Sequence, residues 1–135
     1  MCCWAAAHGT QLEGDFVECG VSTGITSRAV VEYLKFNTSD KRFFLFDTFK
    51  GIPEGQASAG ELPLARSKNE RHYFDCFEEV KATFAAFDNV RLVRGEVPDS
   101  LTDVDIAKVS YLHIDMNIAV PEVAAVNHFW GKLTT

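Results

Sequence analysis

The sequence lacks the features that mark several classes of protein. It carries 13 Lys and Arg against 19 Asp and Glu, a net charge of −6, and no basic cluster. Nucleic acid is therefore not expected as its main partner, because binding to phosphates depends on such clusters. No apolar run approaches the roughly 20 residues of a membrane span, and no basic segment precedes the apolar residues 1–7. We therefore expect no membrane partner and no signal peptide.

Cysteines are few, and their spacing argues against a zinc site and against a disulfide between sequence neighbours. The four are Cys2, Cys3, Cys19 and Cys76, with no CxxC pair and no Cys/His spacing typical of a zinc site. Cys2 and Cys3 are adjacent, which is a poor geometry for a disulfide between them. We expect reduced thiols in a cytoplasmic protein.

The apolar residues that are present suffice for a core. Hydrophobic residues make up 47% of the 135 positions, including 11 Phe and 2 Trp. This length and composition predict a single domain over residues 1–135, without internal repeats.

Short apolar runs typical of strands alternate along the chain with segments whose apolar residues have helical spacing. They predict strands over 15–19, 42–47, 90–94 and 109–114, and helices over 4–12, 25–36, 70–87 and from Pro121 onward. A long loop is expected over 48–69, and such a loop usually serves a site or is disordered. Strands that alternate with helices predict an α/β, Rossmann-like fold, with a parallel sheet covered by helices on both faces.

Helical periodicity also predicts which helix faces are buried. The expected buried stripes are Ala29, Val30, Tyr33 and Leu34 in the first long helix, Phe77, Val80, Phe84 and Phe87 in the next, and Val123, Val126, Trp130 and Leu133 in the last.

A glycine-containing turn follows the first predicted strand. Residues Glu18–Gly24 read E-x-G-x-S-x-G, and the helix N-terminus that follows offers free N–H groups to a ligand. The turn differs from G-x-G-x-x-G because Ser22 replaces the middle glycine, which weakens an interpretation as an NAD site. A merely structural turn is the alternative.

Asp47 strengthens the interpretation of a binding site. It ends the second predicted strand, 23 residues after Gly24. An acid at this position can accept hydrogen bonds from the ribose hydroxyls of an adenosine ligand. The two motifs together favour an adenosine cofactor, and a solvated turn residue is the alternative for Asp47.

Four collinear segments are similar to one known family. The chain resembles the macrocin O-methyltransferase (TylF/MycF-like) family of class I methyltransferases in GDFVECGV, LFDTFKGIP, RGEVPDSL and YLHIDMN, which begin at positions 14, 45, 94 and 111. The resemblance implies S-adenosylmethionine as cofactor. The cofactor-binding residues it implies are Glu18, Gly20, Val21, Ser22, Gly24, Asp47, Thr48, Gly95, Glu96 and Val97.

Within that set, the resemblance gives each group a role. Glu18 and the turn glycines would shape the methionine end, Asp47 would hold the ribose, and Gly95–Val97 would border the adenine. For Glu96, an ordinary surface acid is the alternative.

Asp115 is the predicted catalytic and metal-binding residue. It resembles the first acid of an H-x-D-x-D-like segment that helps to bind Mg²⁺ in metal-dependent members, but here Asn117 replaces the second acid. An amide oxygen can still bind a hard cation, without charge. The alternative is a strand-end acid beside the cofactor. His113 is a candidate base, although a histidine in an apolar strand is more often structural. For His72, the two alternatives are a position in the wall of a pocket and the start of a solvent-exposed helix.

The resemblance therefore predicts O-methylation of a hydroxyl on a sugar or small molecule, with Mg²⁺ assistance left open. The family continues into further strands, so we also expect this chain to be a fragment that lacks the final strands. An NAD- or nucleotide-binding Rossmann domain and a non-catalytic cofactor-binding module are the alternatives. Homo-oligomerisation and the identity of the acceptor stay open.

Overall fold

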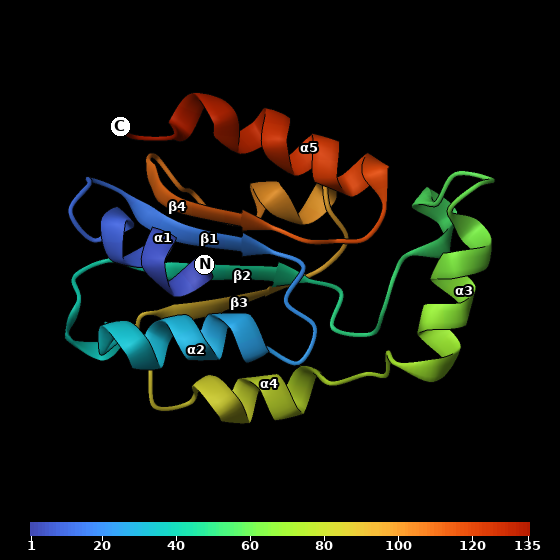
Figure 1. Cartoon of the computed structure of the whole chain (residues 1–135), viewed down its shortest axis with the longest axis horizontal. Coiled ribbons are helices and arrows are strands. Elements are labelled where there is room, and N and C mark those ends of the chain that lie inside the picture. Colours follow the sequence, from blue (N-terminus) through green and yellow to red (C-terminus); the bar gives the residue numbers. More distant parts are fainter.

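A four-stranded parallel sheet forms the centre of the protein, as the computed structural model of residues 1–135 describes it (Figure 1). The order across the sheet is β3 (Val90–Arg94), β2 (Phe43–Asp47), β1 (Asp15–Cys19) and β4 (Val109–Ile114). The chain moves outward from β1 through β2 to β3 and then returns to the opposite side of β1. The order therefore reverses between β1 and β4, which is where open α/β sheets bind ligands.

Helices cover both faces of this sheet, and the predicted α/β class is confirmed. The helices α1 (Cys2–Gly9), α2 (Ile25–Leu34) and α4 (Phe77–Phe84) lie on one face, and α5 (Ala119–Phe129) lies on the other (Figure 1). The helix α3 (Leu62–Arg71) covers neither face, because it stands beyond the carboxyl ends of the strands (Figure 1).

The strands are apolar on both sides because both sides are covered. Phe16 and Phe43 pack into the cluster under α2 and α4, while their neighbours Val17 and Phe44 pack into the cluster under α5. Each fully buried side chain of this kind contributes roughly 1.5–3 kcal/mol. The carboxyl ends of the strands are therefore held at fixed positions.

The expected loop over 48–69 and the expected helix over 70–87 were both partly wrong. Most of α3 lies within the expected loop, and the expected helix is divided by a non-helical segment over 72–76. The helix α3 escaped the pattern because Ala65 is its only buried residue. The break is fixed by the Cys76 N–H, which donates to the Phe49 carbonyl at 2.9 Å, and by the Asp75 carboxylate, which accepts from the Phe77 N–H at 3.3 Å at the start of α4.

Of the stripe predicted over 77–87, Val80, Phe84 and Phe87 are buried and Phe77 is partly buried, although Phe87 lies beyond α4. The stripe predicted for α5 was wrong. In α5 the buried residues are Pro121, Ala125 and Phe129. The predicted residues Val123, Val126 and Trp130 are all exposed, Trp130 by 71%. The helix begins at Ala119, and the small Ala125 lets it approach the sheet while Phe129 contacts the ring of Phe46, with centroids 5.9 Å apart. In α2, Val30 is buried as predicted, but Ala29 and Tyr33 are exposed.

One edge of the sheet is β4, whose first residue pairs with the end of the chain. Leu133 forms an isolated parallel bridge with Val109, and the Thr134 N–H donates to the Val109 carbonyl at 2.9 Å. None of the helices combines the length and the apolar character needed to cross a membrane.

Candidate functional site

A cavity of about 220 Å³ opens at the carboxyl ends of the strands. Its walls come from the turn after β1, the segments after β2, β3 and β4, and the non-helical segment over 72–76. Most of the predicted site residues line it, namely Glu18, Gly20, Val21, Ser22, Asp47, Thr48, Gly95, Val97 and Asp115. Gly24 and Glu96 do not.

The turn after β1 needs glycine for two different reasons. Gly20 has φ +90°, and a Cβ placed on it would lie 2.0 Å from the Asp115 carbonyl oxygen. Gly24 has φ +81° and forms the N-cap of α2, where a Cβ would lie 2.9 Å from the Phe84 ring. Only Gly20 therefore shapes the cavity, whereas Gly24 permits the packing of α2 against α4.

The Asp47 carboxylate fixes the same turn. Its Oδ2 accepts hydrogen bonds from the backbone N–H groups of Val21 at 2.6 Å and Ser22 at 2.8 Å, and its Oδ1 accepts from the Phe49 N–H at 2.7 Å. The Thr48 hydroxyl has one hydrogen to donate, and its oxygen lies 2.6 Å from the Gly51 carbonyl oxygen but 3.3 Å from Oδ1, so the bond to Gly51 is the stronger of the two. A carboxylate has about four acceptor positions, so one position on Oδ1 stays open to a ligand hydroxyl.

Glu18 and His113 form a pair at the floor of the cavity, where β1 and β4 place them opposite each other. The His113 Nδ1 lies 3.1 Å from Glu18 Oε1, and the Ser27 hydroxyl donates to Glu18 Oε2. The hydrogen bond to Glu18 raises the pKa of His113, although partial burial opposes this. Glu18 itself is only 1% exposed, so it reaches a ligand mainly through His113 and the turn that it supports.

The segment after β3 supplies a small apolar wall. Gly95 and the buried Val97 line the cavity. Glu96 is exposed and accepts a hydrogen bond from the Gln56 amide at 3.0 Å. Two of the three residues predicted to border a flat ring therefore line the cavity, and the contact of all three with a ligand stays a prediction.

Asp115 lies at the carboxyl end of β4, exposed, and its carboxylate has no hydrogen-bond partner in the protein. Two residues later, Asn117 has φ +67° and its Oδ1 accepts a hydrogen bond from the Lys68 ammonium. Nowhere do three His, Cys, Asp or Glu side chains come close enough together to hold a metal ion. Residues 1–135 offer here one free carboxylate and one amide oxygen that already accepts from the Lys68 ammonium, and these two groups do not by themselves make up a Mg²⁺ site.

Sequence reasoning missed several residues that line this cavity. Tyr73 and Phe74 come from the segment after α3, and Met116 follows Asp115. Burial, together with the charges of Asp115 and Asp47, raises the pKa of Tyr73, so this hydroxyl stays protonated at neutral pH. Only the position of His72 beside the expected loop hinted at this wall, and His72 does line the cavity.

Comparison with known proteins assigns the family. The model of the macrocin-O-methyltransferase (TylF) family matches residues 2–135. Among solved structures, the O-methyltransferase NovP is 25% identical, with a TM-score of 0.76; the match covers 98% of this chain and 57% of that protein, so this chain spans little more than half of its length. No curated protein matches the sequence. The chain therefore belongs to the macrocin-O-methyltransferase family.

Proposed function

We propose that the cavity binds S-adenosylmethionine and that the chain takes part in methyl transfer to a hydroxyl of a sugar or another small molecule. One observation carries this proposal: the point where the strand order reverses holds a cavity that brings together the turn after β1, the Asp47 carboxylate and the apolar wall after β3. Membership of an O-methyltransferase family supports the reaction type.

The residues present fit the cofactor at its two ends. The open position on Asp47 Oδ1 can accept a ribose hydroxyl, while the small Gly95 and the apolar Val97 leave room for a flat ring. At the other end, the absence of a side chain on Gly20 lets the turn after β1 pack directly against the Asp115 backbone, which keeps the turn and the segment after β4 together at the cavity.

The bound cofactor would supply an electrophilic methyl group on a sulfonium sulfur. The task of the protein is then to hold the acceptor oxygen in line with that methyl carbon and to accept the hydroxyl proton. Asp115 is suited to the second task, because its carboxylate lies at the cavity and no other group of the protein binds it. His113, held by Glu18, lies beside it with its Nε2 free of a protein partner.

The cavity also has polar and aromatic walls. His72, Tyr73 and Asn117 are among the residues that line it. Hydroxyl, imidazole and amide groups donate and accept hydrogen bonds with a polyhydroxylated acceptor, and an aromatic ring can stack on the apolar face of a sugar. This wall supports an acceptor of the sugar or phenol type.

The first test is calorimetric titration of the chain with S-adenosylhomocysteine. We expect one site, with binding weakened in Asp47→Asn and unchanged in the matched surface variant Asp40→Asn, because Asp40 is exposed and its carboxylate binds nothing. A parallel titration with NAD tests the alternative Rossmann function. Tighter binding of NAD, or equal binding of S-adenosylhomocysteine by Asp47→Asn, would count against the proposal.

A further inference from the structure

Two large apolar side chains line the cavity and are exposed to solvent. Ile25, the first residue of α2, is 78% exposed, and Phe74, in the non-helical segment over 72–76, is 57% exposed. Four further apolar side chains of the wall are buried in the protein, namely Phe46, Val21, Ile52 and Val97. Ile25 and Phe74 therefore form an apolar rim of the cavity, whose surface is free to contact a ligand.

The backbone places both residues of the apolar rim. Ile25 begins α2 directly after the turn whose N–H groups are bound by the carboxylate that ends β2. Two residues after Phe74, the Cys76 N–H donates to the Phe49 carbonyl at 2.9 Å. The Cys76 thiol also donates a weak hydrogen bond to the Ser22 carbonyl, with 3.4 Å between sulfur and oxygen. This contact joins the two segments, so the rim is positioned by the fold rather than by loose loops.

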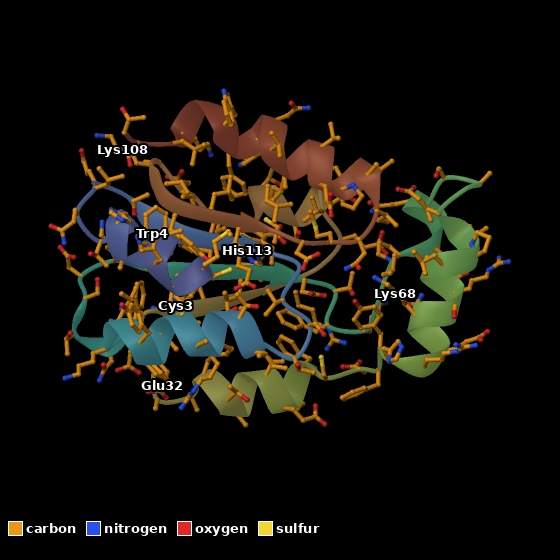
Figure 2. The ribbon with its side chains drawn as sticks, in the orientation of Figure 1. Cys3, Trp4, Glu32, Lys68, Lys108 and His113 are labelled. Atoms are coloured by element: carbon orange, nitrogen blue, oxygen red, sulfur yellow. The ribbon has the colours of Figure 1, made fainter.

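Position distinguishes the apolar rim from other exposed apolar residues. Single exposed apolar side chains are common on protein surfaces and need no explanation. Trp4 is one of them: Figure 2 shows it on α1, whereas His113, which lines the cavity, lies nearer the carboxyl ends of the strands. Ligand pockets are lined mainly by apolar and aromatic side chains, with a few polar groups that orient the ligand. The apolar rim beside the polar residues of the cavity has this composition.

We infer that Ile25 and Phe74 determine specificity for the acceptor by contacting an apolar, ring-sized part of it. This inference rests on the proposed function and narrows its acceptor to a hydroxylated compound that carries such an apolar part. A hydroxyl of a polyol that is hydrophilic on every side would lie against the aliphatic Ile25 side chain without a hydrogen-bond partner, which is unfavourable. A flat apolar ring instead removes apolar surface from water on both sides and can stack against the Phe74 ring.

The apolar rim is separate from the residues proposed to border the cofactor's flat ring. Those residues, Gly95 and Val97, come from the segment after β3. The rim comes from the start of α2, which follows β1, and from the segment between α3 and α4. Contact of the rim with the acceptor therefore predicts that changes in Ile25 or Phe74 leave cofactor affinity unchanged.

The test is NMR titration of the whole 135-residue chain, saturated with S-adenosylhomocysteine, with phenyl β-glucoside and with methyl β-glucoside. The two probes carry the same sugar hydroxyls and differ only in the apolar group. The variants are Ile25→Thr, which keeps a branched Cβ, and Phe74→Ser. Val123→Thr and Trp4→Ser are the matched controls, because both side chains are exposed and neither lines the cavity.

We expect the native chain and both controls to bind phenyl β-glucoside at least ~10-fold more tightly than methyl β-glucoside. In Phe74→Ser this preference should fall below ~3-fold, because the stacking partner is lost, and Ile25→Thr should reduce it as well. Circular dichroism and titration with S-adenosylhomocysteine should find every variant folded, with the affinity of the native chain for S-adenosylhomocysteine.

Three results would overturn the inference. The first is a native chain that does not prefer the phenyl glucoside, including one that binds neither probe. The second is an equal loss of preference in the controls. The third is a loss of S-adenosylhomocysteine affinity in Ile25→Thr or Phe74→Ser, which would assign the apolar rim to the cofactor. A native chain that binds no S-adenosylhomocysteine counts against the proposed function instead, and the two glucosides then test the rim on the unliganded chain.

Discussion

Replacement of Asp47 by Asn tests the best-defined interaction of the site. The Asp47 carboxylate accepts hydrogen bonds from the backbone N–H groups of Val21, Ser22 and Phe49, at 2.6, 2.8 and 2.7 Å. An asparagine can keep its oxygen toward Val21 and Ser22 only by turning its NH₂ group toward the Phe49 N–H. Two donors would then face each other, and the two remaining bonds would lose the assistance of a charge.

The magnitude follows from these bonds. A hydrogen bond to a charged group contributes about 1.5–3 kcal/mol, and a buried donor left without a partner costs about 1–3 kcal/mol. Because Asp47 is half-buried and water can reach part of the site, we expect Asp47→Asn to lower the free energy of unfolding by about 2–4 kcal/mol. Loss of the open acceptor on Oδ1 should also weaken S-adenosylhomocysteine binding by roughly 10- to 100-fold.

Urea denaturation at pH 7 measures the first quantity, and calorimetry of the folded variant at low temperature measures the second. The exposed Asp40→Asn is the matched control for the change of charge. A cost below about 0.5 kcal/mol would refute the idea that this carboxylate holds the turn. Because the turn depends on Asp47, a loss of binding counts as evidence for ribose contact only in a variant whose fold is intact.

Three further predictions address the neighbours of Asp47. Gly20→Ala should prevent stable folding or lower the free energy of unfolding by more than about 3 kcal/mol, because the new Cβ would lie 2.0 Å from the Asp115 carbonyl oxygen. Thermal unfolding compares this variant with Gly55→Ala, whose new Cβ would meet no other part of the chain within 4 Å. Since the hydrogen bond to Glu18 raises the pKa of His113, NMR titration should find a lower His113 pKa in Glu18→Gln, and an unchanged pKa would contradict the pairing. The stability that the charged pair contributes is fully present below the ordinary histidine pKa and is lost as the pH rises through the pKa of His113 in the folded protein. Asp115→Asn should reduce the rate of methyl transfer about 10²-fold or more while S-adenosylhomocysteine affinity stays the same, and an unchanged rate would assign the proton to His113 instead.

The sequence predicted the sheet well because buried strands leave a strong local signal. The runs that end at Cys19, Asp47, Arg94 and Ile114 were placed within one residue. The helix α3 left no such signal, because its single buried residue cannot produce a periodic apolar face. Local patterns therefore predict the elements that pack into the core and miss the helix that borders the cavity.

Contacts within the site were harder to predict than its location. The spacing of Asp47 from the turn indicated a common edge of the sheet, and the structure places both at the cavity. The pairing of Glu18 with His113 depends on β4 lying beside β1, which no local pattern reveals. The same holds for Lys68 and Asn117, whose contact depends on where a polar helix packs.

The residues that the proposed function assigns to the cofactor and to the acceptor share one backbone support. The Asp115 carbonyl oxygen occupies the space where a Gly20 side chain would lie, and the Asp115 N–H donates to the Cys19 carbonyl at 2.9 Å. The turn after β1 is in turn bound by Asp47 through Val21 and Ser22. The proposed ribose-binding and proton-accepting carboxylates are thus joined through a few residues of main chain. In-line transfer needs the methyl carbon and the acceptor oxygen in a fixed relative position, so in the proposed reaction this short hydrogen-bonded path would help by holding the two carboxylates in a fixed relative position.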